Sequence, residues 1–94
     1  MVYDSERKLL NGIELTKLQW QIFEVLLEHI NEPLSANDIS NILCDKYYIS
    51  GINSAITDYR SVRAHISRLN KKSNGLIKRK YYAGYYIEED IKIM

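Results

Sequence analysis

The sequence predicts a small α+β domain in which three helices lie between a short N-terminal β-hairpin and a C-terminal β-hairpin. First, Asn11-Gly12 separates two short apolar runs, and Asn-Gly favours a hairpin because both central positions of a type I′ turn need positive φ. Second, three later stretches carry apolar residues at helical spacing. Third, two β-favouring runs follow the last of these stretches. A chain of 94 residues can build one modest core, so we expect a single domain over residues 1–94.

The first helix is expected over residues 15–30, directly after the hairpin of residues 7–15. Thr16 and Gln19 match a capping box, in which each side chain satisfies a free backbone N–H. The apolar residues that follow cover more than half of the helical wheel, which is too wide for a helix with one neighbour. We therefore predict that this is the central core helix.

The second helix is expected over residues 35–44, after a break at Pro33. Proline lacks the N–H that a helix needs and favours an extended residue before it. Ser35 and Asp38 repeat the capping box. Two helices joined by a tight break and followed by a basic helix have the layout of a helix-turn-helix.

Residues 45–58 show neither the helical nor the strand period, so they predict a loop. Tyr47, Tyr48, Ile49 and Ile52 make this loop too apolar for a plain linker. Two alternatives stay open: these residues fold back onto the core, or they form an exposed contact site for a partner protein, with Tyr47, Tyr48 and Ile52 as the expected partner-binding residues.

The third helix, expected over residues 59–73, has two different faces. Val62, Ile66 and Leu69 fall on one side of the wheel and form an apolar stripe. The opposite side carries Arg60, Ala64, Ser67, Arg68 and Lys71. Arginine forks onto guanine or phosphate, and a small central residue lets the helix backbone come close, so this face suits a DNA major groove. A solvated basic face is the alternative explanation.

Charge is divided unevenly along the chain. Residues 1–50 carry four Lys or Arg against eight Asp or Glu, a net charge of −4, whereas residues 51–94 carry nine against four, a net charge of +5. Between residues 60 and 80 there are eight basic residues and no acidic one. A basic tract free of acids inside a folded domain indicates a polyanionic partner.

A C-terminal β-hairpin is expected over residues 76–88, after Ser73-Asn74-Gly75 ends the third helix with Asn74 or Gly75 as its left-handed residue. Arg79 and Lys80 place positive charge on its first strand. A basic, aromatic hairpin after a basic helix has the arrangement of a wing that reaches the minor groove or the DNA backbone. The acidic end beyond this hairpin is expected to be frayed.

In order and spacing these features resemble the OmpR/PhoB-type winged-helix DNA-binding domain of response regulators. The resemblance covers nearly the whole chain. It rests on four segments: Leu15-Thr16 at the first helix; Pro33-Leu34-Ser35 before the second; VRAHISRLNKK over 62–72, similar to the family's TVDVHISRLRKK; and 77–87, similar to its wing IxTVRGxGYRL, with Gly84 and Tyr85 kept.

The resemblance implies that the third helix enters the major groove, with Arg68 on a base and His65, Ser67 and Arg60 near phosphates. For His65, packing at the flank of the helix is the competing interpretation. The full set of expected DNA-binding residues is Arg60, Ser61, Arg63, Ala64, His65, Ser67, Arg68, Lys71, Lys72, Arg79, Lys80 and Tyr81. The resemblance also implies contact between the 45–58 loop and RNA polymerase, and two copies bound head to tail on repeated half-sites.

Several positions depart from the family pattern. Arg63 stands where the family has an acidic residue, and Asn70 replaces a common arginine. Tyr81 and Tyr82 stand at the wing arginine and the first wing glycine, so we expect a tip that is built without glycine's positive φ. The loop is longer than usual, and no receiver domain precedes these residues. We therefore expect either a stand-alone regulator that phosphorylation of its own chain does not control, or a fragment of a longer regulator.

Two functions from different classes follow. The leading one is a sequence-specific double-stranded DNA-binding transcriptional regulator. The alternative is a winged-helix protein-interaction module, such as a phage or plasmid accessory factor, whose basic face binds an acidic protein. Tyrosines at 47–48, 81–82 and 85–86 favour this alternative because tyrosine is common at protein interfaces.

The sequence does not predict an enzyme, a cofactor or a metal site. It has no glycine-rich phosphate loop and no Cys/His nucleophile pair, and Cys44 is its single cysteine. No apolar run approaches 18 residues, and the N-terminus is too polar for a signal peptide. We therefore expect a cytoplasmic protein without membrane contact.

Overall fold

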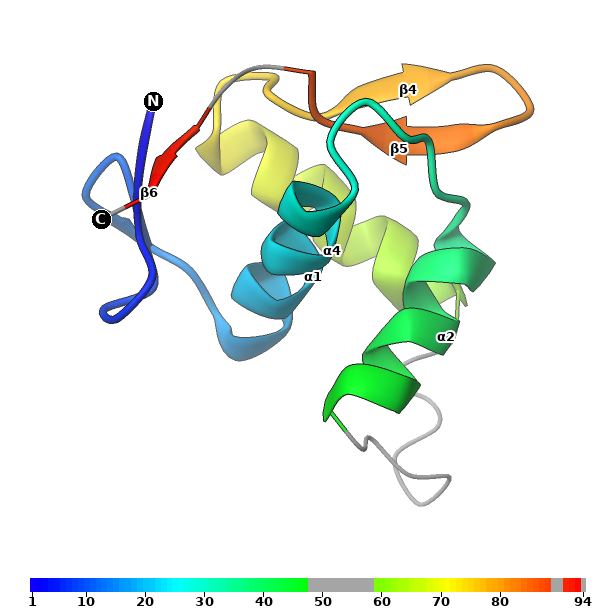
Figure 1. The fold of residues 1–94 in the computed structure, drawn as a ribbon, viewed down its shortest axis with the longest axis horizontal. Coiled ribbons are helices and arrows are strands. Elements are labelled where there is room, and N and C mark those ends of the chain that lie inside the picture. The colour runs from blue at the N-terminus through cyan, green and yellow to red at the C-terminus, as the bar shows by residue number, and fades with distance from the viewer. Residues whose placement is uncertain (48–58, 89–90, 94) are drawn as a thin grey trace.

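The structure is a computed structural model that describes residues 1–47, 59–88 and 91–93. Within these residues it confirms the α+β class, with three helices between an N-terminal sheet and a C-terminal hairpin (Figure 1). The elements in chain order are β1 (Val2–Asp4), β2 (Leu9–Leu10), β3 (Ile13–Glu14), α1 (Lys17–Glu28), α2 (Ala36–Tyr47), α4 (Tyr59–Lys72), β4 (Lys78–Lys80), β5 (Gly84–Tyr86) and β6 (Lys92–Ile93).

The N-terminal sheet has the strand order β3-β2-β1-β6 in the described part of the chain. The predicted turn between β2 and β3 is confirmed, because Asn11 and Gly12 have φ angles of 50° and 81°. The expectation of a frayed C-terminal end is wrong for residues 91–93. Strand β6 pairs in parallel with β1, and the neighbouring Ile91 packs partly buried against the core. Paired backbone and apolar burial both hold this segment in place.

Helix α1 begins at the predicted capping box. The Thr16 hydroxyl accepts the Gln19 N–H at 3.4 Å, and the Gln19 side-chain oxygen accepts the Thr16 N–H at 3.0 Å. Its fully buried residues include Ile22 and Phe23, and the helix packs against both α2 and α4. The central position of this helix is confirmed, although it spans residues 17–28 rather than 15–30.

Helix α2 also begins at its predicted capping box, but it ends later than expected. The Ser35 hydroxyl accepts the Asp38 N–H at 3.0 Å, and the Asp38 carboxylate accepts the Ser35 N–H at 3.1 Å. The helix runs to Tyr47, so the prediction of a loop from residue 45 is wrong for its first three residues. Two contacts with α1 hold this last turn: Lys46 pairs with Glu28, and the Tyr47 ring packs edge-on against Trp20. The rest of the predicted loop, residues 48–58, lies outside the described residues.

The C-terminal hairpin is confirmed, and it is joined to the segment before α2. Strands β4 and β5 pair antiparallel. On its other side Tyr85 exchanges two backbone hydrogen bonds with Leu34, at 2.8 and 2.9 Å. Gly84 makes this approach possible, since a Cβ atom at that residue would lie 2.2 Å from the Leu34 carbonyl carbon and oxygen.

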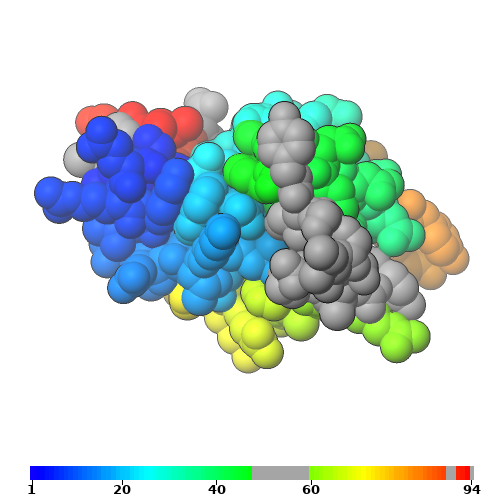
Figure 2. Space-filling view, turned by 90° about the horizontal axis from the view of Figure 1, so that it is seen from below, coloured from blue at the N-terminus to red at the C-terminus, as the bar shows by residue number. Residues whose placement is uncertain are grey.

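The N-terminal sheet and the hairpin lie at opposite ends of the molecule (Figures 1 and 2). The three helices pack against one another between them. Among the described residues, no helix has the length and apolar character needed to cross a membrane.

Candidate nucleic-acid interface

The apolar stripe of α4 determines which side of the helix faces the core. Val62, Ile66 and Leu69 are 0%, 3% and 0% exposed, so this side of the helix is in the core as predicted. The opposite side must then face outward. The exposed residues on it are Arg60, Arg63, Ala64, Ser67, Arg68 and Lys71.

The connection from α4 to the hairpin is held by Asn70. Its backbone carbonyl accepts the Gly75 N–H at 2.9 Å, which closes the end of the helix. Its side-chain oxygen accepts the N–H of Ile77 at 2.9 Å. Asn74 and Gly75, which lie between Asn70 and Ile77 in the chain, have φ angles of 56° and 83°, as expected for a left-handed helix end. The Asn70 amide therefore positions the hairpin relative to α4.

Strand β4 carries Lys78, Arg79 and Lys80, and all three are exposed. A cleft of about 250 Å³ brings Arg79 and Lys80 together with Arg63 of α4. The start of α2, residues 35–37, lines the same cleft. Arg63 and Arg79 also line a second groove, of about 260 Å³, between α4 and the hairpin. The hairpin and α4 thus form one basic surface.

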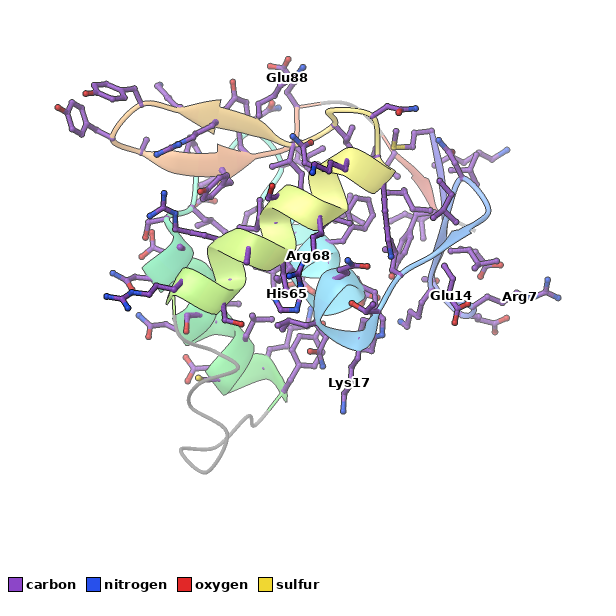
Figure 3. All side chains as sticks on the ribbon, turned by 180° about the vertical axis from the view of Figure 1, so that it is seen from behind. Arg7, Glu14, Lys17, His65, Arg68 and Glu88 are labelled. Carbon is purple, nitrogen blue, oxygen red and sulfur yellow. The ribbon has the colours of Figure 1, made fainter. Side chains whose placement is uncertain are left out.

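Six cations of this basic surface have no carboxylate partner among the described residues. None of Arg63, Arg68, Lys71 and the three β4 cations forms an ion pair with a described carboxylate. The guanidinium of Arg79 lies over the ring of Tyr85, at 5.8 Å from the ring centre. In Figure 3 Arg68 lies along α4, whereas Glu88 points away from this helix. Cations without carboxylate partners are available to bind anions.

His65 and Ser61 lie at the flank of α4 rather than on its exposed face. The Nδ1 atom of His65 lies 2.7 Å from the Ser61 carbonyl oxygen, so the ring nitrogen donates a hydrogen bond within the helix. Both residues are half-buried. For His65, the structure supports packing at the helix flank over a position on the outward face.

Lys72 was expected to bind DNA, but the structure directs its side chain away from the exposed face of α4. Its ammonium group donates to the Glu14 carbonyl at 3.1 Å and to the Gln19 side-chain oxygen at 2.7 Å. One residue rotates the helix by about 100°, so Lys71 faces outward while Lys72 points to the start of α1. Lys72 therefore joins α4 to the body of the domain.

The tip of the hairpin differs from the expectation in its backbone. Tyr82 itself has a φ of 64°, so the tip has a positive φ at a residue that is not glycine. Tyr81 and Tyr82 are 76% and 93% exposed, and their ring centres lie 3.9 Å apart. Their hydroxyl groups are hydrogen-bonded at 3.0 Å. Tyr82 and Lys78 were not among the expected site residues, although both belong to this exposed hairpin.

Of the three expected partner-binding residues, the structure describes Tyr47 alone, and Tyr48 and Ile52 lie outside the described residues. Tyr47 is half-buried against Trp20, with ring centres 5.8 Å apart. Its hydroxyl is buried and has no hydrogen-bond partner among the described residues. Burial raises the pKa of Tyr47, and the nearby negative charge of Glu24 raises it further by a smaller amount. For this residue the structure supports folding back onto the core.

Comparison of the whole chain with protein-family models, curated proteins and solved structures gives no significant match. Its class therefore follows from the architecture itself. An N-terminal sheet, three helices and a C-terminal hairpin in the described residues make a winged-helix-like α+β domain, in which the hairpin takes the place of the wing. No group of His, Cys, Asp and Glu side chains within the described ranges could hold a metal ion.

Proposed function

We propose that this protein is a sequence-specific double-stranded DNA-binding transcriptional regulator. The single observation that carries the proposal is the basic surface at which Arg63, on the exposed face of α4, shares a cleft with Arg79 and Lys80 of β4. The resemblance of α4 and of the hairpin to the OmpR/PhoB-type winged-helix domain supports the same function. An anionic double helix matches this surface in both charge and shape.

In the proposed complex α4 enters the major groove. Arg68 lies on its exposed face and is the best candidate for a base contact, because arginine binds guanine through two parallel hydrogen bonds. Ala64 and Ser67 are small and allow the helix to approach the base edges. Lys71 lies at the C-terminal end of the helix and would contact a phosphate.

The hairpin binds the flanking backbone or the minor groove in this proposal. Arg63 lies in the cleft between α4 and the hairpin with Arg79 and Lys80, so these three cations suit one stretch of phosphates. One small module buries only roughly 600–1,000 Å² on DNA. We therefore propose that two copies bind repeated half-sites, and, from the family resemblance, that the segment predicted as the 45–58 loop contacts RNA polymerase.

A second function is supported by the tip of the hairpin. Tyr81 and Tyr82 are the two most exposed large apolar side chains of the described residues, and tyrosine is enriched at protein interfaces. A winged-helix module of this kind would bind an acidic protein through the basic surface and the two tyrosines.

Fluorescence anisotropy of a labelled duplex at several salt concentrations tests the leading proposal. If four or five phosphates are neutralised, log affinity falls with log salt at a slope of roughly −4. Replacing Arg63, Arg68 and Lys71 by alanine should weaken binding strongly. The slope should also become shallower by about one for each phosphate that is no longer neutralised.

Lys72→Ala provides the matched control, because it removes the same charge from the residue next to Lys71 but not from the exposed face. Its affinity and salt slope should stay close to those of the unmodified protein, compared at a temperature where thermal unfolding shows both to be folded. Duplex binding that is absent at low salt, or equally weakened binding in Lys71→Ala and Lys72→Ala, would contradict binding by this face. Capture of an acidic protein without duplex binding would support the second function.

A further inference from the structure

The hairpin tip carries two aromatic side chains that the fold does not use. Tyr81 and Tyr82 are 76% and 93% exposed, while the next most exposed large apolar residue among those described, Ile93, is 58% exposed. The polar contact that the structure gives them is the hydrogen bond between their own hydroxyl groups. Neither ring contributes to the buried core.

The backbone of the tip also argues against a structural reason for a tyrosine. Tyr82 has a φ of 64°, a conformation in which glycine is free of the strain that a Cβ atom causes. A turn selected for stability alone would carry glycine, asparagine or aspartate at this position. A tyrosine is therefore found where the backbone conformation disfavours it, which indicates that its ring has a role outside the fold.

The surroundings of the two rings are cationic. Lys78, Arg79 and Lys80 precede them on β4, and Lys80 lines the same cleft as Tyr82 and Arg63. The described acidic residue closest in sequence, Glu88, points away from α4 (Figure 3). Aromatic rings beside cations match nucleic acid, because each base offers a flat π-face next to a phosphate. An acidic peptide would engage the cations but would offer the two rings no such face.

We propose that Tyr81 and Tyr82 form an aromatic wedge that stacks on bases of the bound duplex beside the groove occupied by α4. This inference rests on the proposed DNA-binding function and adds a contact that phosphate binding does not supply. The faces of bases in an intact duplex are covered by their neighbours, so stacking requires that one base step opens. The wedge therefore favours steps that open easily, such as pyrimidine–purine steps, or sites where a base is already unstacked.

Two duplexes of the same sequence, one fully matched and one with a single unpaired base, test the wedge. We expect the unmodified protein to bind the second duplex roughly tenfold or more tightly, as stacking on one base accounts for such a difference. The double variant Tyr81→Ala/Tyr82→Ala should lose this preference but keep the salt slope, because no charge is removed. Tyr81→Phe/Tyr82→Phe should retain the preference, since phenylalanine rings also stack. A 2-aminopurine placed beside the unpaired base should change its fluorescence with the unmodified protein and not with the alanine variant.

Ile93→Ala is the control for removal of an exposed apolar side chain, because strand β6 belongs to the sheet at the opposite end of the domain. It should bind both duplexes like the unmodified protein. If Tyr81→Ala/Tyr82→Ala also binds both duplexes with the affinities of the unmodified protein, the wedge is refuted while DNA binding stands. The tyrosines would then be assigned to a protein contact. If the unmodified protein shows no salt-dependent duplex binding, the proposed function fails, and the wedge fails with it.

Discussion

Replacement of Gly84 by alanine should separate the hairpin from the body of the domain. A Cβ atom at this position would lie 2.2 Å from the carbonyl carbon and oxygen of Leu34 and 2.6 Å from the Ser35 nitrogen. These are backbone atoms, so no side-chain rotation can relieve the overlap. Gly84 also has a φ of 127°, which residues with a Cβ atom rarely adopt.

The expected decrease in stability follows from the interactions that must break. Lifting β5 away from Leu34 removes the two backbone hydrogen bonds of Tyr85, each worth about 1 kcal/mol. Keeping β5 in place instead costs roughly 1–3 kcal/mol of backbone strain, in addition to the overlap. We expect Gly84→Ala to lower the free energy of unfolding by about 3 kcal/mol. For a domain of this size, that corresponds to a drop in Tm of roughly 10–25 °C.

Gly75→Ala is a matched control for this measurement. Gly75 also has a positive φ, 83°, but a Cβ atom there would meet nothing within 4 Å. It should therefore show strain alone, about 1 kcal/mol. Thermal and urea unfolding of both variants give the comparison, and hydrogen exchange at the Tyr85 and Leu34 amides reports whether the hairpin has separated. Equal destabilisation of the two variants, or unchanged protection of these amides in Gly84→Ala, would refute the close approach.

Three further substitutions test other parts of the fold. Asn70→Ala leaves the N–H of the buried Ile77 without its acceptor and should cost about 1–3 kcal/mol in urea unfolding; an unchanged midpoint would mean that water replaces the amide. Tyr82→Gly removes the strain of a positive φ and should raise stability by roughly 0.5–1 kcal/mol, whereas a decrease would show that the ring supports the tip. Burial, followed by a hydrogen bond to a carboxylate, raises the pKa of Tyr3 above its usual value of about 10, so the folded state holds a proton that the unfolded state releases. Stability should then fall above pH 10 by up to about 1.4 kcal/mol per pH unit, and Tyr3→Phe should show a shallower fall; the same slope in both proteins would exclude Tyr3 as its source.

The parts of the fold that depend on neighbouring residues could be predicted from the sequence. The Asn11-Gly12 turn and the Thr16–Gln19 capping box involve residues at most three positions apart, so their chemistry is visible in one short stretch. The buried stripe of α4 follows from the helical period in the same way. The class of the domain and the exposed face of α4 could therefore be predicted from local sequence patterns.

The features that sequence analysis missed depend on residues far apart in the chain. Strand β6 exists because β1, at the other end of the chain, offers an unpaired edge. The pairing of Leu34 with Tyr85 joins segments that no local pattern connects. Lys72 is different, since the helical wheel alone places it about 100° from Lys71. Its expected place among the DNA-binding residues rests on the family motif, which has a lysine at this position. A motif gives the residue type but not the direction of its side chain.

The attachment of the hairpin also determines how DNA binding should respond to its separation. Tyr85 is bonded to Leu34 on one side, and Asn70 of α4 holds the Ile77 amide on the other, so the hairpin is held to the helices at both of its ends. If the proposed function holds, Gly84→Ala should remove Arg79 and Lys80 of β4 from the phosphates even where the helices remain folded. Its salt slope should then become as shallow as that of Arg79→Ala/Lys80→Ala, while Gly75→Ala keeps the original slope. If the separated hairpin can still bind the DNA backbone, the salt slope of Gly84→Ala should stay unchanged, because the hairpin cations would still contact phosphates.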